Sequence, residues 1–320
     1  MILFAQASFP GRITALFGQG VIGSAIGRNM RLGGFRTIQS FKIHWDSFRV
    51  DNSLYRSLSH NLAAAITQAV TSSPDDYLLN VVWATGKAGF TSDQNATEAD
   101  LNTFFTILKL IEEFQRDHPS CPIGFFHLSS AGGLFEGQSC ISSESVPRPV
   151  RPYGWIKLMQ EQALLSCPIR MRRVIYRPSS VYGKIRTNHR MGLIPTMILN
   201  GLRQTVTSIY GFDDTLRDFV WVEDVARHIC DDLRRPITQD IIKTLHSGRP
   251  VCLYEVRSTI ERFLNKKLFF QFSTAESNSL PITFSHRCKT ENWRTTSLAT
   301  AVQQIVVDHH LSRYDFWETK

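Results

Sequence analysis

The chain has 320 residues, of which 42% are hydrophobic and 20% are charged. This composition supports a large buried core and excludes an intrinsically disordered chain. The net charge of +8 favours an anionic partner, but the basic residues are spread out, so we expect no nucleic-acid-binding platform. No apolar run approaches the roughly 20 residues that a membrane helix needs.

The cysteines give no sign of a metal site or a disulfide framework. Their positions are scattered, and no C-x-x-C pair occurs. We expect free buried thiols in a reducing cytoplasm, and no bound metal. The six positions are Cys121, Cys140, Cys167, Cys230, Cys252 and Cys288.

Strands and helices alternate along the first half of the chain, after an N-terminus that leads into the first strand. Apolar runs predict strands at residues 12–17, 35–43, 77–86, 123–130 and 172–176. Helical periodicity predicts helices at residues 25–33, 61–70, 99–114 and 153–165. Because several strands are continuously apolar, the sequence predicts an α/β fold with a parallel sheet that helices cover on both faces.

A glycine-rich turn follows the first of these strands. Gly18, Gly20 and Gly23 are spaced as G-x-G-x-x-G, between a strand and a helix. In a strand–helix–strand unit, the N-terminus of that helix offers free N–H groups and a positive dipole end to a pyrophosphate. The context therefore predicts a Rossmann-like, doubly wound sheet that binds a dinucleotide.

The acidic residue that usually holds the adenosine ribose is missing. It should follow about 20 residues after the glycines, at the end of the second strand. The strand end falls near residues 41–42, and Asp46 comes several residues too late. Lys42, helped by Ser40 or Arg36, would attract a 2′-phosphate, so the sequence favours NADP over NAD without excluding NAD.

A second set of residues carries acid–base chemistry. Tyr153 and Lys157 are spaced i, i+4 and would lie on one helix face. Ser129 and Ser130 end a predicted strand, and strand ends of a parallel sheet open onto the ligand crevice. A free phenol has a pKa of about 10, which a neighbouring ammonium and an oxidised nicotinamide would lower. Tyr153 would then exchange a proton with a substrate hydroxyl or carbonyl while hydride moves to or from the cofactor.

The sequence resembles the extended short-chain dehydrogenase/reductases, the NAD-dependent epimerase/dehydratase group that acts on nucleotide sugars. The resemblance covers nearly the whole chain. Besides the glycine turn, it rests on "HLSSAGGLFEG" (127–137), "YGWIK" (153–157), "YRPSSVYG" (176–183), "YGFDDTLRDFVWVEDVA" (210–226) and "LHSGRPVCLYEVRSTIE" (245–261). It implies a dinucleotide domain at residues 1–178 and a smaller, partly interleaved substrate-binding region at residues 179–320.

The resemblance also assigns roles to residues. Tyr153 is the expected acid and base, Lys157 binds the nicotinamide ribose, and Ser130 is the expected catalytic hydroxyl, with Ser129 as the alternative. Arg217 and Arg287 match arginines that bind the nucleotide diphosphate, and Ser180 is a substrate contact. The full expected cofactor set is Gly18, Gln19, Gly20, Val21, Ile22, Gly23, Lys42, Ala84 and Lys157.

The expected activity is hydride transfer at a carbon of a nucleoside-diphosphate sugar, as a keto-sugar reductase or an epimerase. The expected partners are this substrate and a second copy of the chain. The Asp-Glu pair that dehydratases place beside their catalytic threonine is absent, which disfavours a 4,6-dehydratase. A dinucleotide-binding sensor without turnover remains open, although an intact Tyr153 and Lys157 argue against it.

Overall fold

The computed structural model describes residues 1–6, 8–40, 78–90, 92–186, 191–235, 239–273, 280–288 and 290–314, with the single positions 60 and 64. The chain divides into two compact units, each built from separate stretches of sequence. Unit 1 contains Met1–Leu134, Pro149–Arg177 and Ile229–Lys243, and unit 2 contains Phe135–Arg148, Pro178–His228 and Thr244–Lys320.

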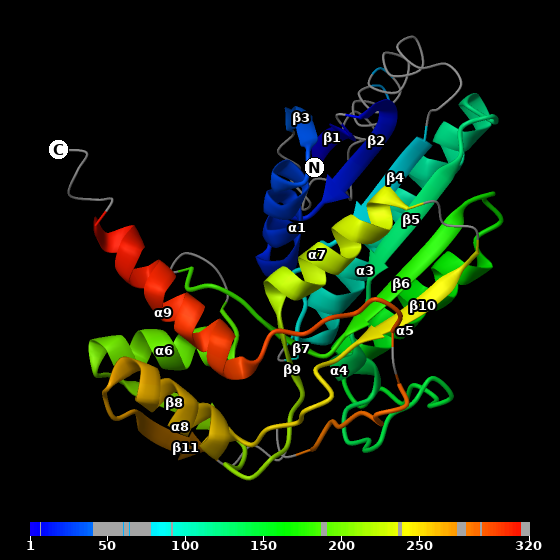
Figure 1. Cartoon of the computed structure of the whole chain (residues 1–320). Helices are drawn as coiled ribbons and strands as arrows, with labels where there is room; N and C mark the ends of the chain where they lie inside the picture. Colours follow the sequence, from blue (N-terminus) through cyan, green and yellow to red (C-terminus); the bar gives the residue numbers. More distant parts are fainter. Residues whose placement is uncertain are drawn as a thin grey trace. The chain divides into compact units, whose positions relative to one another are not determined.

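Unit 1 is built around a seven-stranded sheet (Figure 1). Its strands lie in the order β10-β6-β5-β4-β2-β1-β3, and the neighbouring pairs from β2 to β6 are parallel. β10 is the edge strand opposite β3, and it contains residues of both units. The strands are β1 (Ile2–Gln6), β2 (Phe9–Phe17), β3 (Phe35–Ser40), β4 (Leu78–Trp83), β5 (Ile123–Leu128), β6 (Arg172–Pro178) and β10 (Ile241–Leu245).

The predicted Rossmann-like parallel sheet is confirmed, and it contains one antiparallel strand that the sequence did not predict. β1 lies between β2 and β3 and is antiparallel to both, with Ile2 paired to Leu16 on one side and to Ser40 on the other. Strand–helix alternation predicts direction only for strands that a helix connects, whereas β1 joins β2 through a tight hairpin. A short apolar run at the N-terminus does not reveal its direction or its neighbours.

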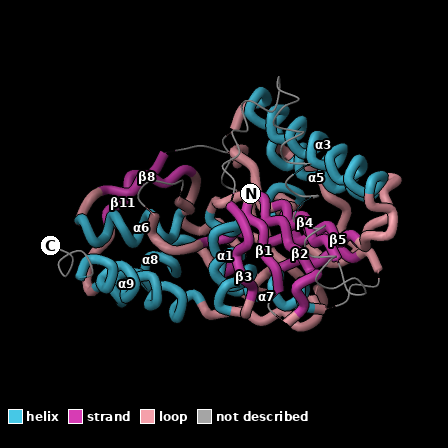
Figure 2. The backbone as a smooth tube through the Cα atoms, turned by 90° about the horizontal axis from the view of Figure 1, so that it is seen from above, coloured by secondary structure: helices cyan, strands magenta, loops and turns pink. Residues whose placement is uncertain are grey.

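Helices cover both faces of this sheet (Figure 2). One face packs against α3 and α5, where the rings of Trp83 and Phe125 both contact Phe104, with centroids 5.7 Å and 6.0 Å away. The other face carries α1 and the Ile229–Arg234 part of α7. Here the Cys230 thiol donates a hydrogen bond to the Ile26 carbonyl oxygen. The helices are α1 (Val21–Leu32), α3 (Gln94–Asp117), α4 (Ala131–Leu134), α5 (Pro152–Ser166) and α7 (Val222–Arg234).

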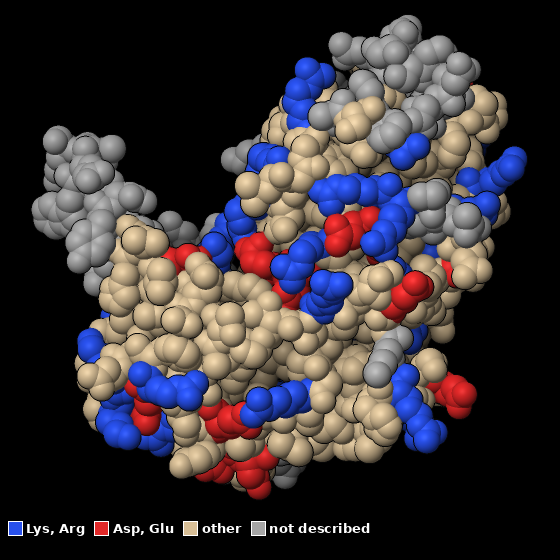
Figure 3. Space-filling model, viewed as in Figure 1, with Lys and Arg blue, Asp and Glu red and all other residues tan. Residues whose placement is uncertain are grey.

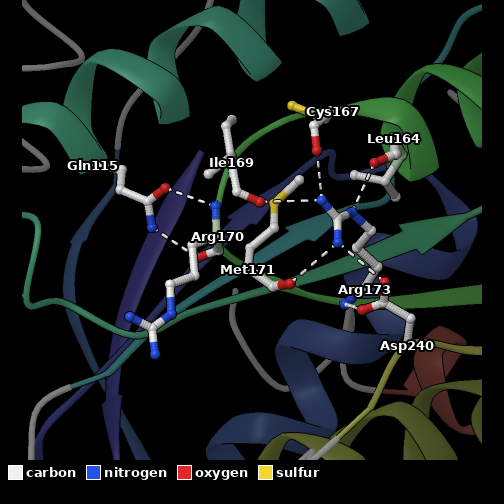
Figure 4. A network of polar contacts seen from close by, with 8 residues as sticks. All are labelled: Gln115, Leu164, Cys167, Ile169, Arg170, Met171, Arg173 and Asp240. Atoms are coloured by element: carbon white, nitrogen blue, oxygen red, sulfur yellow. Dashed lines mark hydrogen bonds and ion pairs between the residues drawn. The ribbon is translucent and has the colours of Figure 1, made fainter.

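The half-buried guanidinium group of Arg173 connects the end of α5 to β6 (Figure 4). Arg173 donates to the backbone carbonyls of Leu164, Cys167 and Ile169 at 2.6–3.0 Å. It also pairs with Asp240 at 3.0 Å. The last carbonyls of a helix lack partners inside the helix, so this arginine satisfies them and fixes the helix against the sheet.

The predicted elements agree with the structure in kind and differ at their ends. The helix predicted at 99–114 starts earlier and is the longer α3, because Asp93 caps it by accepting from the Ala96 N–H at 2.9 Å. The strand predicted at 123–130 ends at Leu128, which leaves both serines beyond it. Apart from position 64, the predicted helix at 61–70 lies outside the described residues, as does the end of the strand predicted at 35–43.

Unit 2 contains two short parallel strand pairs, β7 with β9 and β8 with β11. One face of β8 is covered, because Thr207 and Ile209 are buried while the alternate residues of this strand are exposed. The additional elements are β7 (Ser180–Tyr182), α6 (Leu193–Arg203), β8 (Val206–Tyr210), β9 (Phe219–Trp221), α8 (Leu253–Leu264), β11 (Phe269–Ser273) and α9 (Leu298–Tyr314).

Basic and acidic side chains are interspersed on the face of the molecule shown in Figure 3. The net charge of +8 is therefore not gathered into one continuous basic surface on that face. Among the described residues, no helix combines the length and the apolar character needed to cross a membrane.

Candidate active site

The glycine-rich turn brings three backbone segments into close contact. β2 ends at Phe17, and Gly18 then adopts a φ of +100°, a conformation that favours glycine. A Cβ atom on Gly18 would lie 2.3 Å from the carbonyl oxygen of Ala84, and one on Gly23 would lie 2.2 Å from the carbonyl oxygen of Gly18. The turn, the start of α1 and the end of β4 pack in this way because these positions lack side chains.

The start of α1 fits the pyrophosphate of a dinucleotide. Gly20 is the N-cap residue, and the first turn of the helix contains no acidic residue. A Cβ atom on Gly20 would meet nothing within 4 Å, so this backbone is open to a ligand. N–H groups and a positive dipole end at a helix start favour phosphate. The predicted residues in this turn are Gly18, Gln19, Gly20, Val21, Ile22 and Gly23; Lys42 lies outside the described residues.

The two serines that follow β5 have different surroundings. Ser130 accepts a hydrogen bond from the Gly133 N–H at 3.1 Å and so caps the short helix α4. The Ser129 N–H donates to the Tyr176 carbonyl at 2.8 Å, and its buried hydroxyl oxygen has no hydrogen-bond partner among the described residues. Both serines therefore lie at the carboxyl end of β5, where the sequence places them.

Tyr153 lies against the turn that Ser130 caps. A Cβ atom on Gly133 would lie 3.0 Å from the Tyr153 ring, and one on Gly154 would lie 2.1 Å from the Gly133 carbonyl oxygen. Two glycines facing each other thus allow α4 and the first turn of α5 to touch. On its other side, the Tyr153 ring lies 5.7 Å from the ring of Phe90, between centroids. The structure therefore brings Tyr153 and Ser130 to the same corner of unit 1.

Lys157 follows one helical turn after Tyr153 and is only 7% exposed. Its Nζ atom lies 6.0 Å from the centroid of the Tyr153 ring. It donates to the Leu128 carbonyl and to the Gln160 side-chain oxygen, both at 3.1 Å, which uses two of its three N–H donors. Burial is the main cause that lowers the pKa of Lys157 to about 8.

Two further titratable groups, Glu161 and His127, lie near Lys157. Glu161 is buried and pairs with Arg177 through bonds of 2.6 Å and 3.0 Å. His127 on β5 is fully buried, and neither of its ring nitrogens has a hydrogen-bond partner among the described residues. Burial, and next the charge of Lys157, hold the pKa of His127 well below its usual value. The imidazole is therefore neutral, and Lys157 is the positive group at this end of β5.

The three expected substrate residues belong to unit 2. The backbone of half-buried Arg217 exchanges two hydrogen bonds of 2.9 Å with Val251 and also bridges to Ile282. Ser180 begins β7, and its N–H donates to the Asp218 carbonyl at 3.1 Å. Arg287 is exposed in a turn close in sequence to Ile282. Within unit 2, the backbone thus links the segments that carry these three residues.

The buried carboxylate of Asp218 stabilises the segment that carries Arg217. Asp218 accepts from the Ser179 hydroxyl at 2.6 Å, from the Ser247 N–H and hydroxyl at 2.8 Å and 2.7 Å, and from the Gly248 N–H at 3.0 Å. These four bonds hold two loops of unit 2 to the start of β9. Sequence reasoning did not predict this role, although Asp218 directly follows the predicted Arg217.

Sequence reasoning also missed three residues around Tyr153 and Lys157. Phe90 lies against the Tyr153 ring, and the Arg151 guanidinium lies over Phe90, 5.2 Å from its centroid. Gln160 binds Lys157 directly. The i, i+3 spacing of Lys157 and Gln160 was a signal in the sequence, whereas Phe90 is distant in the chain and has none.

Comparison with solved structures finds proteins of the same fold. The structure of MoeE5 in complex with UDP-glucuronic acid and NAD is 18% identical, with a TM-score of 0.71 over 92% of this chain and 97% of that one. The UDP-glucose 4-epimerase of Thermotoga maritima is 16% identical, with a TM-score of 0.70 over 94% and 98%. RMD from Pseudomonas aeruginosa, complexed with NADPH, is 18% identical, with a TM-score of 0.59 over 72% and 80%. These likenesses show a common fold.

The family comparison is more specific. No curated protein gives a significant match to the chain. A family model described as the NAD dependent epimerase/dehydratase family matches residues 19–240, which include Gly20 and Gly23 of the glycine turn, both serines, Tyr153 and Lys157. The matched region covers more than half of the chain. The chain therefore belongs to the NAD dependent epimerase/dehydratase family.

Proposed function

We propose that the protein transfers hydride at a carbon of a nucleoside-diphosphate sugar, as a keto-sugar reductase or as an epimerase. The observation that carries the proposal is the meeting of Ser130, Tyr153 and Lys157 at the carboxyl end of β5, in the unit that also carries the glycine turn. This combination supplies a hydroxyl, a phenol and a positive charge beside a site that fits a pyrophosphate.

The proposed cofactor is NAD or NADP, held at Gly18–Gly23 with Ala84 and Lys157. When bound, a nicotinamide dinucleotide takes hydride from a sugar carbon or returns it. Tyr153 exchanges the proton of the reacting oxygen, and Ser130 donates a hydrogen bond that orients this oxygen. The ammonium of Lys157 favours the phenolate form of Tyr153. Ser129, whose hydroxyl is buried in the described structure, is the alternative to Ser130.

The proposed substrate contacts in unit 2 are Ser180, Arg217 and Arg287. A guanidinium matches two phosphate oxygens with two parallel N–H donors, which suits a nucleoside diphosphate. MoeE5 and the Thermotoga maritima epimerase were solved with UDP-sugars, and this supports a nucleotide sugar as the substrate class here.

The test begins with the purified protein and a panel of uridine and deoxythymidine diphosphate sugars and their 4-keto forms. Oxidation of NADH or NADPH in proportion to product indicates a reductase. Interconversion of two sugars without net cofactor turnover indicates an epimerase. Mass spectrometry of the nucleotide released on denaturation identifies any resident cofactor.

Tyr153→Phe is the matched variant, because it removes only the phenolic oxygen. We expect turnover to fall by about 10²-fold or more, since general acid–base groups supply about 10²–10⁴-fold. The melting temperature should change little. Near-wild-type turnover in this variant would exclude Tyr153 as the acid and base. Tight dinucleotide binding with no turnover of any substrate in the panel would instead favour a sensor.

A further inference from the structure

The ammonium group of Lys157 is held by two neutral acceptors. Its Nζ atom donates to the Leu128 carbonyl oxygen and to the Gln160 side-chain oxygen, each at 3.1 Å. Gln160 is only 1% exposed, so its amide lies in the protein interior rather than in solvent. Neither acceptor carries a formal charge, so these bonds fix the position of the ammonium without neutralising it.

Two carboxylates lie close enough to favour the charged lysine, but each is bound to other groups. Glu161 on α5 forms its ion pair with Arg177 on β6. Asp100 on α3 accepts hydrogen bonds from the backbone N–H groups of residues 87 and 88, at 3.1 Å and 2.7 Å. Both carboxylates oppose the lowering of the Lys157 pKa that burial causes. Their negative charges are therefore shared with partners other than Lys157.

In the part of the chain that the structure describes, two further titratable groups near Lys157 are His127 on β5 and Tyr153 on α5. The buried ring of His127 is neutral, since its pKa lies well below the usual value. Tyr153 is the group whose ionised form the ammonium would stabilise, with its ring centroid 6.0 Å from Nζ. In a medium of low dielectric constant, the field of a charge that is not neutralised by a contacting carboxylate acts strongly over this distance.

We propose that Gln160 is a positioning residue, whose neutral amide fixes the ammonium of Lys157 beside Tyr153 and leaves its positive charge available there. This inference rests on the proposed function, in which Tyr153 ionises during the reaction. A carboxylate in place of the amide would hold the ammonium as well or better. It would also cancel much of the field at Tyr153, because opposite charges in contact form an ion pair.

The decisive variant is Gln160→Glu, which keeps the side-chain length and adds one negative charge. For oxidation of the sugar hydroxyl, in which Tyr153 acts as the base, we expect the acid limb of the pH–rate profile to move about one pH unit to higher pH, with a loss of turnover of about tenfold at pH 7. The control is Gln162→Glu, which adds the same charge to an exposed position on the same helix. This control should retain the wild-type profile.

A second variant and a second readout keep the test independent of folding and of turnover. Gln160→Met keeps the bulk of the side chain but removes the acceptor, so it should also lower turnover and move the acid limb of the same profile to higher pH. Tyrosinate absorbance, taken as the difference from the same protein with Tyr153→Phe, reports the ionisation of Tyr153 directly. We expect its midpoint to move in the same direction in both Gln160 variants.

The inference would be overturned if the midpoint of Tyr153 ionisation were the same in the wild type, in Gln162→Glu and in a Gln160 variant that folds. If Tyr153→Phe abolishes turnover in that case, the proposed function stands and only the role of Gln160 fails. If Tyr153→Phe is fully active, the proposed function fails first. The two failures are therefore distinguishable.

Discussion

Lys157 carries a positive charge in a place that disfavours one. A buried ammonium loses most of its hydration, and the hydrogen bonds to Leu128 and Gln160 replace only part of it. The same residue contributes the charge that the proposed chemistry needs. Conflict between stability and function at one side chain is typical of a site that binds or transforms a ligand.

This conflict predicts how Lys157→Met changes stability with pH. In the unfolded chain a lysine loses its proton near pH 10.5, whereas burial lowers the folded-state pKa of Lys157 to about 8. Between these values the unfolded state binds more protons, so the stability of the wild type rises with pH. The difference in the free energy of unfolding, variant minus wild type, should therefore be largest below pH 8, where the variant is most stable relative to the wild type. It should then fall by about 3 kcal/mol as the pH approaches 10.5.

Urea unfolding at a series of pH values measures this difference. Lys109→Met is the control, because it removes an exposed ammonium from α3 and should show no such trend. A constant difference between Lys157→Met and the wild type across the range would mean that Lys157 does not change its ionisation there.

At the residue scale, the sequence predicted which side chains meet but not how they are held. The i, i+4 spacing places Tyr153 and Lys157 on one helix face whatever the surroundings. The acceptors of Lys157 depend on its rotamer and on the packing of β5 against α5, which no local pattern encodes. The same holds for Phe90, whose contact with Tyr153 comes from a loop more than sixty residues earlier in the chain.

At the scale of elements, the site depends on the contact between α4 and α5. The contact is made by Gly133 and Gly154, and it places the Tyr153 ring against the turn that Ser130 caps. Side chains at these two positions would force the helices apart. The distance between the hydroxyl of Ser130 and the phenol of Tyr153 is thus set by two residues that have no side chain.

Gly154→Ala should disturb this contact. Its Cβ atom would lie 2.1 Å from the Gly133 carbonyl oxygen and 2.9 Å from Pro149, and the first of these neighbours is backbone. Overpacking of this kind costs about 1–3 kcal/mol, and the shift of α5 should lower turnover along with stability. Melting temperature and turnover, measured on the same sample, check both effects.

Gly27→Ala is the matched control on α1. Its Cβ atom would make only ordinary contacts at 3.6 Å or more, and alanine favours a helix over glycine. We expect this variant to be as stable as the wild type or slightly more stable. Wild-type stability and turnover in Gly154→Ala would show that the two helices separate at little cost.

The helices and strands themselves were largely predictable, with one informative exception. The glycine turn, the apolar runs and the helical periodicity predicted β2, α1, β4, α3, β5, α5 and β6. The antiparallel β1 escaped prediction because four of its five residues are buried without alternation, so the pattern carried no information on direction. Helix ends were predicted less well than helix centres, because capping residues such as Asp93 lie outside the apolar pattern.

At the scale of the whole molecule, the proposed function divides between two units. The acid–base residues and the glycine turn belong to unit 1, and the expected phosphate-binding arginines belong to unit 2. Sequence motifs placed the expected domain boundary near residue 178, which stays a prediction. They did not predict that unit 1 includes a third stretch, Ile229–Lys243. The chain returns there to the seven-stranded sheet, and this return depends on the packing of β10 against β6 at the sheet edge.

A nucleoside diphosphate should stabilise the protein through unit 2. A ligand that binds only the native state raises the melting temperature, so uridine or deoxythymidine diphosphate at millimolar concentration should do so. Arg217→Ala should weaken this binding by about 1.5–3 kcal/mol, the range for a hydrogen bond to a charged group. Calorimetric titration of wild type and variant gives the two affinities.

The control for this titration is Arg203→Ala, which removes an exposed guanidinium at the end of α6 in the same unit. Its affinity for the diphosphate should equal that of the wild type. Equal losses in both variants would indicate a general effect of charge, and the absence of any stabilisation by nucleoside diphosphates would count against a nucleotide-sugar substrate.

The inserted strand β1 bears on the choice between NADH and NADPH. Neighbouring strands lie about 4.8 Å apart, so the end of β3 at Ser40 is roughly 10 Å from β2 rather than one strand spacing away. Recognition of the adenosine ribose at the end of the second strand assumes that this strand lies next to the glycine turn. The greater separation weakens any contact that a side chain at Ser40 makes with a 2′-phosphate.

Ser40→Asp tests this consequence, because the position is exposed and the new carboxylate would repel a 2′-phosphate in its reach. With β1 in between, we expect the ratio of the dissociation constants for NADPH and NADH to change by less than about threefold, which corresponds to less than ~0.7 kcal/mol. Fluorescence titration with both reduced cofactors measures the ratio. Lys42→Ala, titrated alongside, tests the sequence-based prediction that Lys42 attracts the 2′-phosphate, in which case NADPH alone should bind more weakly. A loss of tenfold or more for NADPH in Ser40→Asp would mean that the end of β3 contacts the ribose in spite of β1, and that the spacing of the strands does not govern cofactor choice.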